Sequence, residues 1–414
     1  MPSQPRDLRG DPPLPAVPRA RDDDFAPPAV DTRRRVWTEA AGASAPHVFG
    51  APVPFEAARG KVENFVGFAQ VPLGIAGPLR VDTGRGMREV YVPMATTEGA
   101  MVASYSRGMG LLRSGGGARA RVLSEGLTQN PMLVYADAEQ AAQAAGVAAA
   151  SFEDLQRIVA GTTRHGRLVA LRPEVVGKRL IISLVFRTGD AIGINMAAKA
   201  ADLCAKEIAA RTGAKERYVH GQDVEKRANA RSLIEGRGRR VVADATIPRA
   251  ELVDRTRASP EALVAIQKSY AVGFAELGTH NWLVQAANGI AAVMIACGQD
   301  AAYVTESATG ILDFEVTEKG DLYASVHLPS LLVGTVGGGS GQGTAVECLR
   351  LLGCAGENGA NVFAEILAAT VLAGDLSLMA AFAAHEFVDA HERLGRNRPD
   401  AKASSRGSDA HTGP

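Results

Sequence analysis

The stretch that most constrains this chain runs over residues 363–384, FAEILAATVLAGDLSLMAAFAA. Its side chains are apolar or small almost all round, so a helix made from it has no face suited to water and must be covered on every side. Glu365 and Asp375 interrupt the run, and no uncharged apolar stretch of the chain reaches the ~18 residues of a membrane span. We therefore predict a buried helix of a soluble protein, with no membrane partner.

Charge and cysteine content limit the classes of function. Lys plus Arg and Asp plus Glu each number 45, and this neutral balance argues against nucleic acid as a partner, because phosphate binding needs a basic surplus. The four cysteines form no CxxC pair, and no signal peptide opens the chain, so we predict a cytoplasmic protein. His385 and His391 are six residues apart, about 240° round a helix, so we predict no metal site.

Composition and the order of expected helices and strands divide the chain into four regions. Residues 1–45 are rich in Pro, Arg and Asp and are predicted to be a disordered arm, and residues 396–414 a disordered tail. Residues 130–218 alternate in the order β-α-β-β-α, which is typical of a ferredoxin-like unit. We predict an α+β fold in which this small domain is inserted into a large helix-rich domain made of residues 46–129 and 219–395.

Two glycine-rich segments are candidates for contact with a ligand. After the strand in RLIISLVFRTGDAIGINM (179–196), Asp190 is placed to cap a helix whose N-terminus, with Gly193, could bind a nucleotide pyrophosphate. The alternative is a plain strand-turn-helix. The run GTVGGGSGQG (334–343) fits neither a Rossmann fingerprint nor a P-loop, so it is either a dinucleotide-binding loop of another kind or a flexible surface loop.

Four ionisable residues stand out: Glu98, Lys226, Asp300 and His391. Each alone is explained by a solvated surface position. Asp300 is the sharpest case, because it ends the apolar run in MIACGQDAAYV (294–304), where a carboxylate is either a helix cap or a paired catalytic acid. Together the four supply two acids, an ammonium and an imidazole, which are the groups needed to reduce a carbonyl and protonate a leaving group.

Seven collinear segments resemble the 3-hydroxy-3-methylglutaryl-coenzyme A reductase family, specifically its NADPH-dependent class I form without a membrane anchor. They are ENFVGFAQVPLGIAGPL, MATTEGAMVAS, DAIGINM, IEGRG, IACGQDAA, GTVGGG and LAGDLSLMAA, followed by His391. The resemblance covers residues 62–395. It implies a large domain around a long central helix, a small domain that binds NADPH, and a homodimer or homotetramer with active sites at the subunit interface.

The resemblance also assigns residues. It places Glu98, Lys226, Asp300 and His391 at the catalytic positions. The implied NADPH contacts are Thr163, Arg164, Asp190, Ile192, Gly193, Asn195, Val336, Gly337 and Gly338. The implied substrate contacts are Ser104, Gln129, Arg227, Lys268 and Asn288.

The implied reaction is two successive hydride transfers that convert 3-hydroxy-3-methylglutaryl-CoA into mevalonate and free CoA. Lys226 stabilises the oxyanion and His391 protonates the departing thiolate. Glu98 supplies a proton in the second reduction, and Asp300 is expected to bridge Lys226 and Glu98.

Several residues depart from the family pattern near the acyl pocket. Gln129 stands where the family usually has an Arg that grips the acyl carboxylate, and Val219, Glu225, Arg227, Leu283 and Gln285 also differ. The loss of one charge-assisted contact costs about 1.5–3 kcal/mol. This leaves three alternatives open. The first is weak binding of the usual substrate, with Arg227 and Lys268 compensating. The others are a reductase of a related acyl-CoA and an acyl-CoA-binding paralogue without turnover.

Overall fold

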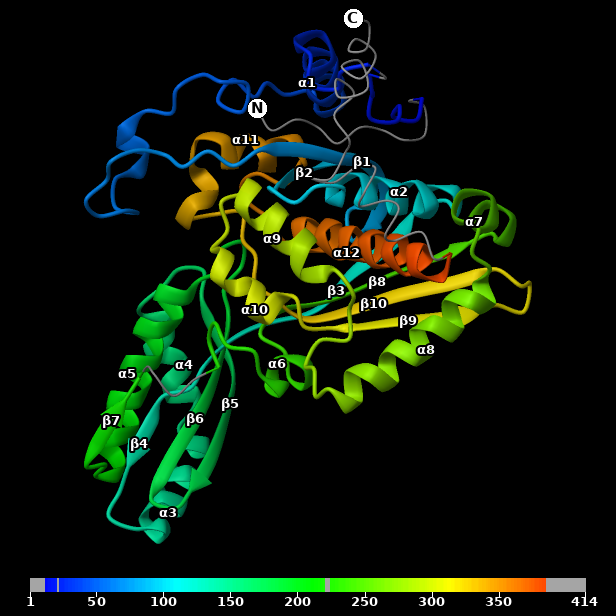
Figure 1. The fold of residues 1–414 in the computed structure, drawn as a ribbon. Helices are drawn as coiled ribbons and strands as arrows, with labels where there is room; N and C mark the ends of the chain where they lie inside the picture. The colour runs from blue at the N-terminus through cyan, green and yellow to red at the C-terminus, as the bar shows by residue number, and fades with distance from the viewer. Residues whose placement is uncertain (1–11, 21, 220–223, 385–414) are drawn as a thin grey trace, which may run out of the picture.

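The computed structural model describes residues 12–20, 22–219 and 224–384, in which helices and strands alternate (Figure 1). The strands are β1 (Leu73–Thr83), β2 (Gly86–Ala95), β3 (Ala118–Gln129), β4 (Met132–Val134), β5 (Arg167–Val176), β6 (Arg179–Arg187), β7 (Glu216–Tyr218), β8 (Gly238–Ile247), β9 (Ile311–Val316) and β10 (Leu322–Leu331). The α-helices are α1 (Pro27–Ala41), α2 (Met101–Ser114), α3 (Ala138–Ala150), α4 (Phe152–Ala160), α5 (Ile194–Thr212), α6 (Ala230–Ile234), α7 (Arg249–Thr256), α8 (Pro260–Glu276), α9 (Ala286–Ala296), α10 (Val304–Ser307), α11 (Gly343–Leu351) and α12 (Ala360–Ala383). Short 3-10 helices are η1 (Phe55–Ala58), η2 (Ala301–Tyr303) and η3 (Gly338–Gly341).

Helix α12 lies at the centre of the larger lobe, in contact with α2, α8 and α9 and with the strands β1, β3, β8 and β10 (Figure 1). Almost all of its 24 residues are buried, which confirms the predicted buried helix. Within the described residues it is the only helix long and apolar enough to cross a bilayer, and 83% of the window that passes this test is buried inside the protein.

Both carboxylates of α12 are bound to backbone N–H groups of other segments. Glu365 accepts from Gly84 and Val122, each at 3.0 Å. Asp375 accepts from Val284 at 3.0 Å and from Gln285 at 2.9 Å. Burial raises the pKa of Asp375 to about 6, although these two N–H bonds act in the opposite direction. The two acids that interrupt the apolar run therefore fix the position of the helix.

The sheet connects the two lobes through β3. Its strand order is β7-β4-β6-β3-β8-β10-β9, with β1 and β2 joined to it through β3. Strand β3 pairs antiparallel with β8 over Arg119–Gly126 and then with β6 over Leu127–Gln129. One continuous strand thus belongs to the large lobe at its start and to the small lobe at its end.

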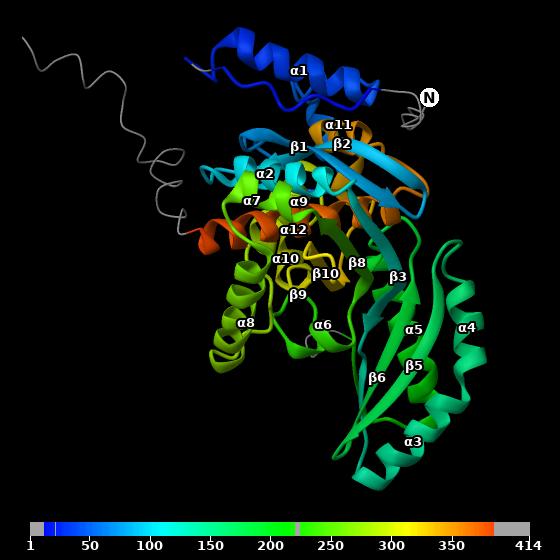
Figure 2. The same cartoon turned by 90° about the vertical axis from the view of Figure 1, so that its right-hand side faces the viewer.

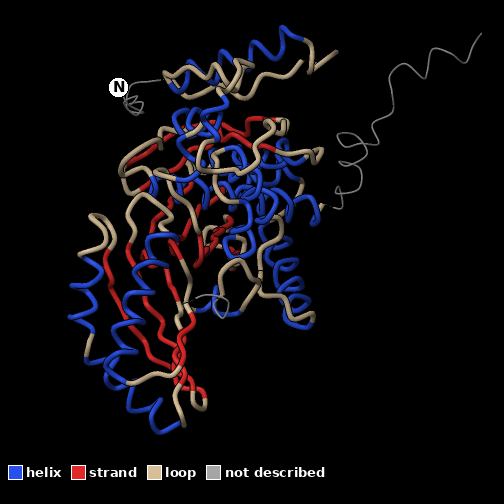
Figure 3. Tube along the Cα trace, turned by 90° about the vertical axis from the view of Figure 1, so that its left-hand side faces the viewer, coloured by secondary structure: helices blue, strands red, loops and turns tan. Residues whose placement is uncertain are grey.

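The small lobe has the order β4-α3-α4-β5-β6-α5-β7, and its helices lie on one side of its strands (Figures 2 and 3). The predicted β-α-β-β-α order holds, with the first helix split in two and a short strand added. The α+β class, with a ferredoxin-like part attached to a helix-rich one, is confirmed. Strand β7 has only three residues, too few for a periodic sequence signal.

The predicted disordered arm of residues 1–45 is wrong over its described part. Helix α1 packs near β2 and α11, and its Trp37 is only 4% exposed. Leu14 is also buried, and its N–H donates to Glu89 Oε2 at 2.7 Å. These two buried apolar side chains, which the polar composition obscured, help to hold this segment, and Figure 1 shows α1 as an ordered helix at the edge of the large lobe. The predicted tail of residues 396–414 lies outside the described residues.

Helices α2 and α12 approach so closely that one glycine of α2 has no room for a side chain. A Cβ added to Gly108 would lie 1.8 Å from the Ala373 carbonyl oxygen. Two residues on, Gly110 has no neighbouring atom within 4 Å of such a Cβ. The two positions differ in their surroundings but share the same helix.

We predict that Gly108→Ala lowers the free energy of unfolding by about 3 kcal/mol or more, because a backbone clash cannot be relieved by a rotamer change. Gly110→Ala is the matched control and should raise it by about 0.5–1 kcal/mol, since Ala is the better helix former. Urea unfolding of both variants measures the difference. Equal effects of the two substitutions would contradict the close approach of α2 and α12.

Candidate active site

Lys226 and Asp300 meet beyond the C-terminal end of α9. Asp300 caps η2, with its Oδ1 accepting from the Ala302 N–H at 3.0 Å, and its Oδ2 lies 2.7 Å from Lys226 Nζ. Burial acts to raise the pKa of Asp300, but the bonds from Lys226 and Ala302 outweigh it and the net shift is downward. Asp300 is therefore both a helix cap and the partner of a cation, so the two expected structural roles occur together. The side chain is not buried in its apolar run, because 46% of it is exposed.

The backbone of Lys226 is held in an unusual conformation. Its φ is +56°, a left-handed value that lysine adopts only when its surroundings impose it. Its N–H donates to Glu306 Oε1 at 2.7 Å, and its ammonium lies 4.9 Å from the centroid of the Tyr303 ring. Lys226 is thus fixed at both its backbone and its side-chain end.

A buried ionic cluster lies behind this lysine. Arg237 contacts Glu306 at 3.0 Å and Glu225 at 3.2 Å, and the Tyr303 hydroxyl donates to Glu225 Oε1 at 2.5 Å. Arg237 and Glu306 are almost without exposed surface. Burial raises the pKa of Glu306, although the Arg237 charge acts in the opposite direction. A buried pair of this kind is strongly destabilised when one partner is removed.

Sequence reasoning missed Arg237, Tyr303 and Glu306 as parts of the site. Arg237 lies inside the IEGRG segment used for the resemblance, so its position was visible but its role was not. Tyr303 and Glu306 follow Asp300 within six residues, and their roles depend on contacts with a loop about 80 positions away. No local pattern reports such contacts.

The two glycine-rich segments meet, as a shared ligand-binding role requires. The Thr335 N–H donates to the Asp190 carbonyl at 2.8 Å, and a Cβ on Gly334 would lie 2.8 Å from the Ile192 nitrogen. Only glycine allows this backbone contact. The prediction that Asp190 caps α5 is wrong, because its carboxylate accepts the N–H groups of Asn358 and Ala360 at the start of α12.

The N-terminus of α5 is left without a side-chain cap. Its N-cap is Gly193, at φ +82°, and no side chain in the described part of the chain caps it. Asn195 lies in the first turn, and the loop of Thr163 and Arg164 approaches it, since a Cβ on Gly166 would lie 2.5 Å from Met196 Cε. Free N–H groups and the helix dipole suit a phosphate here. The loop of Val336, Gly337 and Gly338 is joined to the same place through Gly334.

The turn after α9 connects the glycine loop to the lysine pair. Gln299 Oε1 accepts from the Gly334 N–H at 2.8 Å, and Asp300 is the next residue. Gly298, at φ +64°, lies so close to the loop that an added Cβ would be 2.6 Å from the Gly339 carbonyl oxygen. The candidate phosphate site and the Lys226–Asp300 pair are therefore neighbours in one chain.

A second group of polar residues gathers where α2, α9 and α12 meet. Ser104 Oγ lies 3.1 Å from Ser377 Oγ and accepts from Gln285 Nε2 at 3.3 Å. Asn288 is exposed in the first turn of α9. Glu98 is exposed in the loop before α2; burial is the main cause of the raised pKa of Tyr105 beside it, with a small contribution from the Glu98 charge.

The two groups lie toward opposite ends of α9, which has 11 residues and so is about 16 Å long. Among the residues that the structure describes, no hydrogen bond or ion pair joins Glu98 to Lys226 or Asp300. The expected bridging of Lys226 and Glu98 by Asp300 is therefore absent from the single chain. Lys268 is exposed on α8, and His391 lies outside the described residues.

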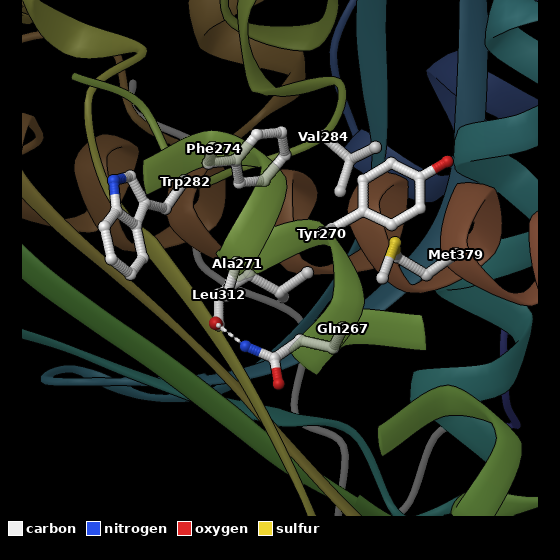
Figure 4. Close-up of a pocket in the computed structure, with 8 residues that line it drawn as sticks. All are labelled: Gln267, Tyr270, Ala271, Phe274, Trp282, Val284, Leu312 and Met379. Carbon is white, nitrogen blue, oxygen red and sulfur yellow. Dashed lines mark hydrogen bonds between the residues drawn. The ribbon is translucent and has the colours of Figure 1, made fainter. Parts of the chain in front are cut away.

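An apolar pocket lies between α8, β9 and α12 (Figure 4). Gln267 Nε2 at its edge donates to the Leu312 carbonyl at 3.1 Å, and Tyr270 stacks on Phe382 with ring centroids 5.6 Å apart. Its lining residues are Gln267, Tyr270, Ala271, Phe274, Trp282, Val284, Leu312 and Met379. The pocket includes none of the predicted site residues.

Gln129 is completely buried at the end of β3, and neither its Oε1 nor its Nε2 has a hydrogen-bond partner in the described structure. Its neighbour Thr128 accepts from Arg237 Nε at 3.1 Å through its carbonyl, which places this strand end beside the ionic cluster. An amide in this state costs about 1–3 kcal/mol of stability.

Comparison with known proteins identifies relatives over nearly the whole described chain. A model of the family described as hydroxymethylglutaryl-coenzyme A reductase matches residues 29–396. The 3-hydroxy-3-methylglutaryl-coenzyme A reductase of Haloferax volcanii is 40% identical over 375 residues, which are 89% of this chain and 93% of that protein. The reductase of the same name from Aeropyrum pernix is 41% identical over 375 residues, covering 88% of this chain and 89% of that protein.

Among solved structures, the class II 3-hydroxy-3-methylglutaryl-CoA reductase from Streptococcus pneumoniae bound to NADPH superposes with a TM-score of 0.71. The superposition covers 87% of this chain and 99% of that chain, at 19% sequence identity. At this identity the likeness shows a shared fold.

We predict that Gln129→Met raises the free energy of unfolding by about 1–3 kcal/mol, because the substitution removes an unpaired buried amide at similar volume. The matched control is Gln285→Met, also buried, whose amide is bonded to Gly374 and Ser104 and whose loss should lower stability. Urea unfolding measures both. Destabilisation by Gln129→Met would show that its amide has a partner after all.

Proposed function

The chain belongs to the hydroxymethylglutaryl-coenzyme A reductase family, and we propose that it reduces 3-hydroxy-3-methylglutaryl-CoA to mevalonate and free CoA in the mevalonate pathway of isoprenoid synthesis. The family match over residues 29–396 supports this reaction. The observation that carries it in the structure is the Lys226–Asp300 pair beside two converging glycine loops.

We assign the chemical roles as follows. NADPH supplies the hydride of each of the two reductions. The exposed Lys226 ammonium stabilises the oxyanion that forms at the thioester carbonyl and later at the aldehyde, and Asp300 holds that ammonium in place. Glu98 gives a proton in the second reduction, and His391 protonates the thiolate of the departing CoA.

For NADPH we propose the residues around the α5 N-terminus. The uncapped N–H groups after Gly193 fit a pyrophosphate, and the loop of Val336, Gly337 and Gly338 lies next to them. Thr163 and Arg164 supply a hydroxyl and a guanidinium for a 2′-phosphate, which favours NADPH over NADH. We keep the class I assignment as a proposal that rests on the sequence resemblance.

We also propose that the active site is completed by a second copy of the chain. Glu98, Ser104 and Asn288 lie toward one end of α9 and Lys226 at the other. Since Glu98 and Lys226 are both assigned to the same carbonyl, we propose that each comes from a different protomer. The segment near η1 exposes an apolar surface that a partner can cover: Phe55, Phe65 and Phe68 form edge-to-face contacts, and Val66 is 98% exposed. A homodimer, alone or paired into a tetramer, fits both features.

The remaining proposals concern the domain boundaries and the cellular location. We propose a large domain of residues 46–129 and 219–395 and an inserted NADPH-binding domain of residues 130–218. The passage of β3 from one lobe to the other near Gln129 supports this boundary. We further propose that the protein is soluble and cytoplasmic.

A second candidate is the reduction of a related acyl-CoA. The neutral Gln129 amide, buried and unpaired, supports it, because it offers no charge for an acyl carboxylate. Arg227 and Lys268 are exposed cations and could bind that carboxylate in its place.

We predict that two NADPH are oxidised for each CoA released, with mevalonate as the product, because the thioester passes through an aldehyde on its way to the alcohol. Absorbance at the nicotinamide band, a thiol assay and product identification measure the three quantities. A ratio of one would indicate release of the aldehyde. Higher kcat/KM for another acyl-CoA in the same assay would favour the second candidate.

We predict that Glu98→Ala and Lys226→Ala, each inactive alone, recover activity when the two chains are co-expressed. If one active site takes Glu98 from one protomer and Lys226 from the other, half of the random dimers carry one intact site, or about a quarter of the wild-type activity. Co-expression of Lys226→Ala with Asp300→Ala is the control and should recover nothing, because that pair lies in one chain. Absence of recovery in the first mixture would contradict the shared site.

A further inference from the structure

Tyr303 contacts two neighbouring side chains, those of Glu225 and Lys226. It is the last residue of η2, the 3-10 helix capped by Asp300, and it is 3% exposed. The Lys226 ammonium lies 4.9 Å from the centroid of its ring, and its hydroxyl donates to Glu225 Oε1 at 2.5 Å. Glu225 directly precedes Lys226, so one side chain touches the ammonium and also holds the neighbouring residue.

The ion pair with Asp300 cannot fix the ammonium alone. The side chains of Lys226 and Asp300 are 41% and 46% exposed, and ion pairs in such water-accessible positions hold weakly. Lysine also carries its charge on a flexible four-carbon chain. The face of an aromatic ring attracts a cation, and the buried Tyr303 ring supplies a second contact whose position is fixed by its surroundings.

The Tyr303 ring is itself firmly held. Arg237 lies 6.0 Å from the ring centroid and binds Glu225 and Glu306. Glu306 in turn accepts the Lys226 N–H at 2.7 Å. The ring, the lysine backbone and the buried cluster therefore form one connected unit.

We propose that Tyr303 is a positioning residue for Lys226: its ring face and its bond to Glu225 hold the ammonium where the carbonyl oxygen of the substrate must lie. The inference rests on the proposed function of Lys226 as the group that stabilises the oxyanion. It adds a residue that touches neither substrate nor cofactor and acts through Lys226 alone.

The test compares three substitutions in the full-length enzyme. Tyr303→Leu and Tyr303→Met remove the ring, and we expect kcat to fall about two- to fivefold in each, the effect of losing a cation–π contact to a partly exposed ammonium. Tyr303→Phe keeps the ring and loses only the hydroxyl, so its kcat should fall less. Since Lys226 serves both reductions, kcat for the free aldehyde should fall by the same factor, while KM for NADPH stays within about twofold of wild type.

Tyr323→Leu in β10, which makes the same substitution away from the site, is the matched control and should leave kcat unchanged. Circular dichroism melting of each variant separates loss of fold from loss of rate, and Tyr303→Met replaces Tyr303→Leu if the latter does not fold. Wild-type kcat in the Leu and Met variants, with Lys226→Ala inactive, would overturn the role of Tyr303 alone. Equal losses in the Phe and Leu variants would overturn the role of the ring. Wild-type kcat in Lys226→Ala would overturn the proposed function of Lys226, and Tyr303 would then have nothing to position.

Discussion

The burial of α12 is the constraint on which the rest of the structure depends. A 24-residue helix without a polar face must be enclosed by other elements, and here α2, α8, α9 and the sheet enclose it. Its two carboxylates bind specific backbone N–H groups and so determine which segments pack against it. Glu365 accepts N–H groups from β3 and from the β1–β2 turn, and Asp375 accepts those of Val284 and Gln285 at the start of α9. Burying an acid is costly unless its oxygens are bonded, so each bond selects one arrangement of the surrounding segments.

The candidate site combines an accessible charge with a buried support. In the role that we propose, Lys226 must remain accessible to a substrate carbonyl, and accessibility weakens every electrostatic contact that holds its side chain. The position of Lys226 must therefore be fixed by neighbouring residues that water does not reach. Arg237 and Glu306 are such residues, since both are fully enclosed and Glu306 holds the Lys226 backbone. The left-handed φ of Lys226 is kept in this way, at a conformational cost that the buried cluster offsets.

The sequence predicts the elements with strong local signals and fails where contacts are distant. The buried helix and the strands of the small lobe follow from local sequence patterns. The contact between the two glycine segments agrees with the shared cofactor that the family resemblance implies; the residues alone left the role of each segment open. The cap assigned to Asp190 was wrong because its carboxylate serves α12, about 170 residues further on. The arm was wrong because two apolar anchors, Leu14 and Trp37, outweigh a polar composition. Asp300 was correctly paired with Lys226, but its separation from Glu98 depends on the length of α9 and on which ends its neighbours occupy.

Helix α9 connects the core of the large lobe to the glycine loop of residues 334–339 and to the Lys226–Asp300 pair. Its N-terminal end is tied to α12 by the two N–H bonds of Asp375. Beyond its C-terminal end, Gln299 accepts the Gly334 N–H and Asp300 binds Lys226, so one peptide bond separates the contact to the glycine loop from the contact to the lysine. Any shift of the loop therefore moves the lysine pair with it. In the proposed reaction the hydride donor and the charge that stabilises its product need a fixed separation. This turn supports that separation because the Gln299 amide and the Asp300 carboxylate, which make the two contacts, belong to adjacent residues. The glycine at 298 is then required, because any side chain there would separate the turn from the loop.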